Sequence, residues 1–153
     1  MPLLSRAMGS SNWDYFVPYQ HDLNAALLQL QAQVLADGAY YWAPGGRGSA
    51  SRYPNRPTTM ADLFSDELVQ QEGTHSILDM DEVVGPDEEP DFAAVAPVTA
   101  DEARERTGTE ILTREHAPHI RTLADKAWYG RYAVLHDTDG KPSEIYFFGY
   151  SGG

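Results

Sequence analysis

An amphipathic helix is the first element that the chain predicts, over residues 20–37. Apolar side chains recur there at spacings of four, three and four, the pattern of one helical face. These positions are Leu23, Leu27, Leu30 and Val34. Gly38 follows directly, and glycine favours the left-handed conformation in which many helices end.

Strand patterns lie on both sides of this helix and return at the end of the chain. Residues 13–17 alternate before Pro18, residues 40–42 are an aromatic run, and residues 74–84 alternate over a longer stretch. The strongest β signal is the pair of aromatic and β-branched runs at residues 128–136 and 143–150. Asp139 and Gly140 between them are typical hairpin turn residues.

Further helices are predicted between these runs, and together the elements define a fold class. A helix fits residues 60–71, a capping box at Thr99 and Glu102 begins another, and Pro118 suits the first turn of a third. We therefore expect a single α+β domain over residues 12–150, with a largely antiparallel sheet, a C-terminal β-hairpin and three to four helices. Residues 1–11 are expected to be extended or disordered, with Met1 and Met8 both possible starts, and residues 151–153 to form a flexible tail.

Composition excludes several classes of protein. The chain has 153 residues, a net charge of −12 at pH 7 and no cysteine. An acidic balance argues against binding nucleic acid through its phosphates, and the lack of cysteine excludes disulfides and thiolate chemistry. With no signal sequence and no apolar run long enough for a membrane span, we expect a soluble, cytoplasmic protein with no cofactor.

The negative charge is concentrated in one third of the chain. Residues 59–110 carry fifteen acids and two cations, whereas the segments on either side are almost neutral. Localised like charge opposes folding but steers association with a cationic partner. The leading hypothesis is thus a binding module, an inhibitor, immunity-type antagonist or adaptor, that docks a basic protein through this segment. The predicted contact residues are Asp79, Asp81, Glu82, Asp87, Glu88, Glu89 and Asp91.

The alternative is a small enzyme or ligand-binding domain. On a strand over residues 74–84, His75, Asp79 and Asp81 share one face, and a carboxylate can orient an imidazole for general-base work. Partners from another strand would be needed, because residues four apart on a strand do not hydrogen-bond. His75 would then lie at the mouth of a pocket with aromatic walls formed by Trp13, Tyr15, Tyr41, Trp42, Trp128 and Tyr146.

Three further patterns have simpler explanations. His116 and His119 have a spacing that suits two metal ligands, but a solvated helix start is the favoured explanation, because Pro118 breaks the preceding turn and no H-E-x-x-H pattern is present. Arg47, Arg52 and Arg56 lie among glycines and serines as in an anion-binding loop, without the lysine of a P-loop. The G-x-S-x-G pattern at residues 149–153 lacks the helix that must follow a nucleophilic serine.

Overall fold

A five-stranded sheet forms the centre of the molecule. The structure is a computed structural model that describes residues 11–45 and 56–151. The strands are β1 (Ser11–Pro18), β2 (Glu82–Val83), β3 (Ala94–Pro97), β4 (Tyr129–His136) and β5 (Pro142–Ser151). The α-helices are α2 (Leu23–Asp37), α3 (Met60–Leu63), α4 (Glu67–Glu72), α5 (Ala100–Thr107) and α6 (Ala117–Ile120).

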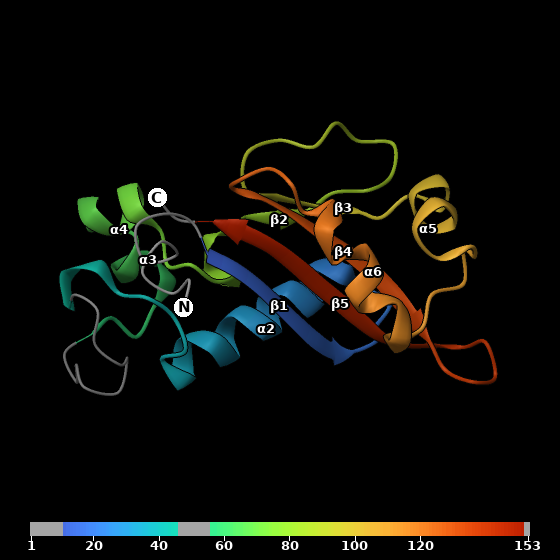
Figure 1. The fold of residues 1–153 in the computed structure, drawn as a ribbon. Coiled ribbons are helices and arrows are strands. Elements are labelled where there is room, and N and C mark those ends of the chain that lie inside the picture. Colours follow the sequence, from blue (N-terminus) through green and yellow to red (C-terminus); the bar gives the residue numbers. More distant parts are fainter. Residues whose placement is uncertain (1–10, 46–55, 152–153) are drawn as a thin grey trace, which may run out of the picture.

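The strands follow the order β1-β5-β4-β3-β2, so the last strand of the chain is the second in the sheet. β5 makes long antiparallel pairings with both β1 and β4, whereas β3 and β2 add to β4 through short parallel pairings. Helix α2 lies behind the sheet and α6 in front of it (Figure 1). The α+β class, the single domain and the C-terminal hairpin predicted from the sequence are confirmed, with two parallel pairings added to an otherwise antiparallel sheet.

Both faces of β5 are buried, because a layer of helices covers each side of the sheet. Ile145 and Phe147 pack with α2, and Tyr146 and Phe148 pack with α6 on the opposite face. Alternation along β5 therefore places residues 145–148 in one or the other apolar cluster, which explains why this stretch is apolar without interruption. The aromatic-rich ends of the chain supply the large aromatic side chains of the core, and the acidic segment adds aliphatic core residues such as Leu63 and Ile77 as well as the strands β2 and β3.

Helix α2 forms as its pattern predicts. The Asp22 side chain accepts a hydrogen bond from the Ala25 N–H at its start, and Gly38 ends it in the left-handed conformation. Leu27, Leu30 and Val34 are buried against the sheet.

Two predicted elements differ, one because a side chain competes for backbone hydrogen bonds and one because its backbone pairs outside the sheet. The helix expected over residues 60–71 is divided into α3 and α4, since Asp66 caps a new start by accepting from the N–H groups of Leu68 and Val69. This division raises the helix count to five among the described residues. The aromatic run at residues 40–42 is not a strand: Tyr41 N–H donates to the Thr74 carbonyl, and a 3-10 turn follows at Ala43–Gly45.

The strand expected over residues 74–84 is also absent, apart from the two residues of β2. The Ser76 hydroxyl accepts from the Leu78 N–H and begins a 3-10 turn at Ile77–Asp79. Thr74 N–H donates to Asp79 Oδ1 at 2.7 Å. These local bonds replace the ladder that a strand would need, so His75, Asp79 and Asp81 do not share a strand face.

The two ends of the chain lie partly outside the described residues. Residues 1–10 and 152–153 are not described, and Ser11 already belongs to β1. Ser151, assigned from the sequence to a flexible tail, is instead the last residue of β5 and is fully buried. Its hydroxyl donates to Asp79 Oδ2 at 2.5 Å, which holds this end of the strand inside the protein.

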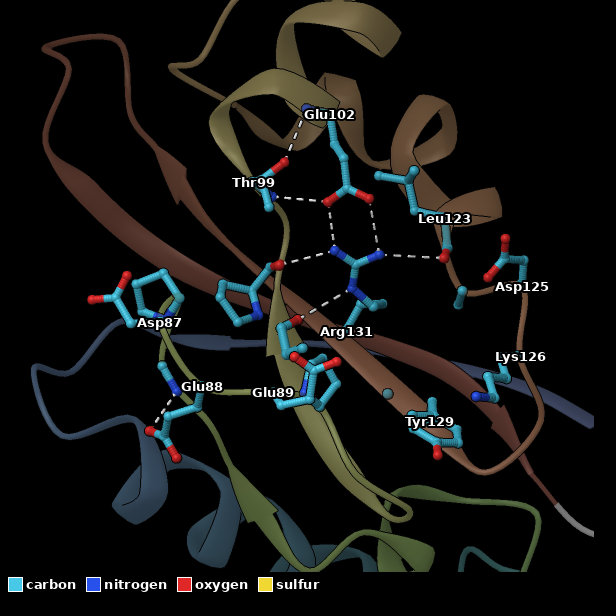
Figure 2. Close-up of a pocket in the computed structure, with 17 residues that line it drawn as sticks. Asp87, Glu88, Glu89, Thr99, Glu102, Leu123, Asp125, Lys126, Tyr129 and Arg131 are labelled. Atoms are coloured by element: carbon cyan, nitrogen blue, oxygen red, sulfur yellow. Dashed lines mark hydrogen bonds and ion pairs between the residues drawn. The ribbon is translucent and has the colours of Figure 1, made fainter.

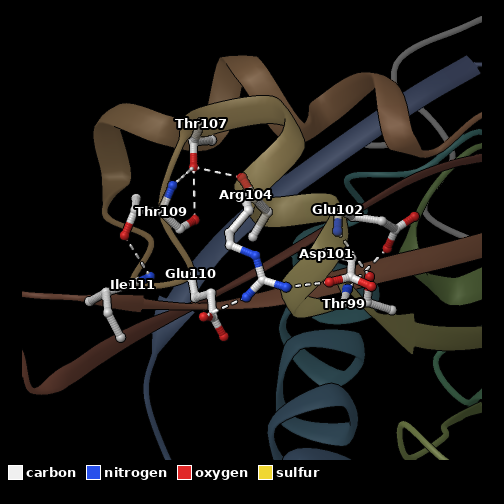
Figure 3. A network of polar contacts seen from close by, with 9 residues as sticks. Thr99, Asp101, Glu102, Arg104, Thr107, Thr109, Glu110 and Ile111 are labelled. Atoms are coloured by element: carbon white, nitrogen blue, oxygen red, sulfur yellow. Dashed lines mark hydrogen bonds and ion pairs between the residues drawn. The ribbon is translucent and has the colours of Figure 1, made fainter.

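Helix α5 begins at the predicted capping box. The Glu102 N–H donates to the Thr99 hydroxyl, and the Thr99 N–H donates to the Glu102 carboxylate. In the middle of the helix, Arg104 pairs both with Asp101 in the first turn and with Glu110 beyond the helix end (Figure 3). The charge of this part of the acidic segment is therefore partly balanced by its own arginine.

Candidate partner-binding surface

The connection between β2 and β3 carries the densest group of carboxylates. We call residues 85–91 the acidic loop; it contains Asp87, Glu88, Glu89 and Asp91, all exposed. Parallel strands cannot be joined by a tight turn, so the chain arches away from the sheet here (Figure 1). Glu88 stabilises the loop by accepting a hydrogen bond from the Gly85 N–H at 2.9 Å. Among the residues with described positions, Asp87 and Glu89 have no hydrogen bond or ion pair.

An aromatic pair lies at the end of the acidic loop. The rings of Phe92 and Trp128 stack with their centroids 5.6 Å apart, and Phe92 is 59% exposed. An aromatic side chain beside unpaired charge combines the two parts of a docking site, an anchor that can be desolvated and a charged rim.

The backbone beneath the aromatic pair is strained. Ala93 and Trp128 have φ angles of 65° and 72°, in the left-handed region that disfavours side chains with a Cβ. Two hydrogen bonds fix this geometry: Ala93 N–H donates to the Trp128 carbonyl at 2.8 Å, and Trp128 N–H donates to the Tyr150 carbonyl at 2.9 Å. The strain costs about 1–2 kcal/mol per residue, and strained positions of this kind cluster at functional sites.

A pocket of about 560 Å³ lies between the acidic loop and residues 123–126. Figure 2 shows the loop carboxylates on one side, Asp125 and Lys126 on the other, and Arg131 between them. Five carboxylates and two cations line the pocket, which gives it a formal charge of −3. They are Asp87, Glu88, Glu89, Glu102, Asp125, Lys126 and Arg131.

Arg131 holds the pocket together rather than offering a free charge. Its guanidinium donates to both carboxylate oxygens of Glu102 and to backbone carbonyls of β3 and of the turn at Leu123. Burial raises the pKa of Glu102, but the hydrogen bonds from Arg131 and Thr99 outweigh it and hold that pKa below its ordinary value. The pair thus stays ionised and ties α5 to the sheet.

The second cation of the pocket is held differently. Lys126 Nζ lies 4.2 Å from the centre of the Tyr129 ring, in a cation–π contact. Asp125 on the same wall is exposed and makes no side-chain hydrogen bond or ion pair within the described ranges. Among the described residues that line the pocket, Lys126 is therefore the cation without an ion pair, and the carboxylates with neither an ion pair nor a side-chain hydrogen bond are Asp87, Glu89 and Asp125.

The predicted contact residues separate into two groups. Six of the seven are exposed, and four of these lie in the acidic loop while Asp81 and Glu82 lie at the edge of the sheet beside it. Asp79 is the exception, because it is buried and accepts hydrogen bonds from Thr74 and Ser151. Burial raises the pKa of its carboxyl, against the opposing effect of these bonds. Asp79 is thus a structural residue and not a surface contact.

The predicted catalytic group is not assembled as expected. His75 has a φ of 54° and packs edge-on against Tyr41, with ring centroids 4.9 Å apart. Asp81 is exposed, whereas the Asp79 carboxylate belongs to the buried cluster. The walls of the predicted aromatic pocket are also separated, since Trp13 packs on the α2 face of the sheet and Tyr146 on the α6 face.

The remaining predicted sites have structural explanations where they are described. His116 Nδ1 accepts from the Thr113 N–H at 2.9 Å, and His119 is exposed. Arg56 donates to the Gly38 carbonyl and lies over the Tyr40 ring; Arg47 and Arg52 lie outside the described residues. Within residues 11–45 and 56–151, no three His, Asp or Glu side chains gather closely enough to hold a metal ion.

Several residues of this surface were missed from the sequence. The aromatic pair joins residues 36 positions apart, and Asp125, Lys126 and Tyr129 reach the pocket only through the fold. One signal was present: Phe92 is the only aromatic residue between Phe64 and Trp128, and it directly follows the acidic run.

Comparison with protein-family models, curated proteins and solved structures finds no match to this chain. No helix in the described part of the chain combines the length and apolar character that crossing a bilayer requires.

Proposed function

We propose that this protein is a binding module that docks a basic protein partner through the acidic loop and the aromatic pair. The exposed stack of Phe92 on Trp128, held beside unpaired carboxylates by a strained backbone, is the observation that carries the proposal. Aromatic side chains supply the desolvated anchors of an interface, while charge at its rim speeds encounter and selects the partner.

The role of an inhibitor, immunity-type antagonist or adaptor acting in the cytoplasm fits this surface. Such proteins need a preformed docking face and no chemistry of their own. The alternative of a small-ligand domain with His75 at its mouth has less support, because the aromatic side chains proposed as its walls pack on opposite faces of the sheet.

Neutralising the acidic loop tests the electrostatic part of the proposal. The variant D87N/E88Q/E89Q/D91N should capture a basic partner from native lysate about tenfold less well than the wild type. Capture by the wild type should also fall between low salt and ~0.5 M salt, because salt screens exposed charges. Bound proteins would be quantified by mass spectrometry.

A matched control carries the same charge change on other elements. In D62N/E67Q/E115Q/D139N, four exposed carboxylates of α3, α4, the 114–116 turn and the hairpin are neutralised. Capture should be nearly unchanged. Equal losses in the two variants would show that only net charge matters and would refute a localised docking surface.

Truncating the aromatic anchor tests the part of the proposal that concerns apolar contact. Phe92→Ala should weaken capture about tenfold with little effect on stability, since Phe92 is 59% exposed. Leu28→Ala is the control, because Leu28 is 63% exposed but lies on α2. If both substitutions leave capture unchanged, the aromatic pair is not an anchor.

A further inference from the structure

We infer that the pocket beside the acidic loop receives an arginine side chain of the partner. This inference rests on the proposed function and names the group that the partner inserts. The argument combines the size of the cavity, the charges left unpaired on its walls, and the aromatic ring that forms part of its lining.

The cavity has the dimensions of a ligand site. Its volume of about 560 Å³ falls within the range of pockets that bind small molecules and long side chains. Its lining adjoins the aromatic pair along the chain, because the acidic loop that forms one wall directly precedes Phe92 and Tyr129 on the other wall directly follows Trp128. A partner anchored on Phe92 would thus have its neighbouring side chains at the pocket.

The unpaired charges select a cation. Arg131 has donors bound to Glu102 and to the carbonyls of Ala96, Pro97 and Leu123. An anion would therefore find only Lys126 to neutralise it. Asp87, Glu89 and Asp125 remain available to a cation, and they come from opposite walls of the pocket (Figure 2).

The Tyr129 ring shows how a cation would be held. The chain's own Lys126 ammonium already lies 4.2 Å from the ring centre. Lys126 is exposed and makes no ion pair among the described residues, so an incoming group can displace it toward solvent.

Arginine fits this arrangement better than lysine. A guanidinium is planar, stacks on aromatic faces and is more weakly hydrated than an ammonium. It also directs several N–H donors outward in its plane, which suits carboxylates on two separate walls. A lysine would meet the same charges with a compact, strongly hydrated group.

The test uses the full chain and three capped tripeptides, Gly-Arg-Gly, Gly-Lys-Gly and Gly-citrulline-Gly. In an NMR titration, the arginine peptide should shift the backbone amides of Asp125, Lys126 and Tyr129 in a saturable way. The lysine peptide should bind about threefold more weakly, and the citrulline peptide, which keeps the shape but not the charge, should cause no shifts. Equal binding of citrulline, or shifts that fall elsewhere, would overturn the inference.

Variants of the pocket sharpen the result. Asp125→Asn and Tyr129→Leu should each weaken the arginine peptide about threefold to tenfold, whereas Lys126→Met should strengthen it. Because Asp125 is exposed, Asp125→Asn remains informative if Tyr129→Leu affects folding. Spermidine is a further arm: if it binds the same residues more tightly than the arginine peptide, the pocket takes a free polyamine and the inference is wrong.

The two proposals fail in different ways. If partner capture depends on the acidic loop and Phe92 but the arginine peptide shifts no pocket residue, this inference falls and the proposed function stands. If the peptide binds the pocket but capture ignores both the loop variant and Phe92→Ala, the proposed function falls, and with it the assignment of the arginine to a partner.

Discussion

A buried chain of polar side chains connects three parts of the fold through single residues. Trp13 Nε1 donates to the Ser151 hydroxyl at 3.1 Å, which in turn donates to Asp79. The same carboxylate accepts from the N–H and hydroxyl of Thr74. Buried polar groups are stable only when they are paired in this way, so β1, β5 and the turn at residues 77–79 depend on one another.

Asp79 makes the stability of the protein dependent on pH. Burial raises the pKa of its carboxyl above the ordinary value of 3.8, so the folded chain binds this proton more tightly than the unfolded chain. The contribution of Asp79 to the free energy of unfolding is therefore fully present below about pH 4 and is lost as the pH rises through the folded pKa of this group. Asp79→Asn should remove this component of the pH dependence, as measured by urea unfolding across the range.

Asp81→Asn is the matched control, since it removes the same charge from an exposed site two residues away. Its pH profile should follow the wild type. If the stability of Asp79→Asn changes with pH as steeply as that of the wild type, general charge repulsion and not Asp79 causes the pH dependence. Asp79→Ala should cost about 1–3 kcal/mol, because it leaves the Thr74 N–H without its partner.

Two glycines make room for the Trp13 ring. Gly149 and Gly130 are paired across β5 and β4, and Trp13 lies opposite Gly149 on β1. A Cβ added at Gly149 would lie 2.7 Å from Trp13 Cζ2. Gly149→Ala should thus lower the free energy of unfolding by about 1–3 kcal/mol, measured by chemical denaturation.

Gly85→Ala provides the comparison for this substitution. Its Cβ would meet only Glu88 Oε1, at 3.3 Å, which is the end of a flexible side chain. Gly85→Ala should therefore change the free energy of unfolding only slightly. An equal loss in the two variants would mean that contact with Trp13 is not what restricts position 149.

At the scale of elements, the capping box couples α5 to the pocket. Glu102 is bound both by Thr99 at the helix start and by Arg131 on β4. Thr99→Ala should destabilise the protein by about 1 kcal/mol, measured as a shift of the denaturation midpoint. Thr99→Ser keeps the hydroxyl and should restore most of the stability; failure to do so would point to lost methyl packing instead.

Elements with strong local signals were predictable from the sequence. The apolar stripe and Gly38 defined α2, and the turn at Asp139 and Gly140 defined the hairpin. The run at residues 74–84 was misleading because its alternation has the strand period, while Thr74, Ser76 and Asp79 bind nearby backbone instead. Periodicity cannot detect such competition, which depends on where each side chain finds its partner.

The acidic loop was predictable as a charged segment, but the pocket was not. Of the seven carboxylates predicted as partner contacts, six are exposed near one edge of the sheet and Asp79 is buried; the contact role of the six stays a prediction. The opposite wall comes from residues 123–131, which contact the loop only because β3 pairs with β4. Long-range pairing of this kind leaves no trace in local sequence patterns.

On the scale of the whole molecule, the densest negative charge lies at one edge of the sheet. The aromatic-rich ends of the chain supply β1, β4 and β5, while the acidic segment supplies β3, the edge strand β2 and the acidic loop, together with core residues such as Leu63, Ile77 and Val95. A short, charged edge strand resists pairing with other sheets. The same arrangement leaves the acidic loop free to meet a partner without disturbing the core.

The strand order also has a consequence for how the chain folds during synthesis. Among the five strands of the sheet, β1 is synthesised before the others, yet its partner is β5, the last of them. Trp13, Tyr15 and Val17 therefore remain without their partner strand until β5 has been made. Pairing between distant segments slows folding, so we expect the nascent domain to become compact only once β5 is available, with β1 exposed to chaperones until then.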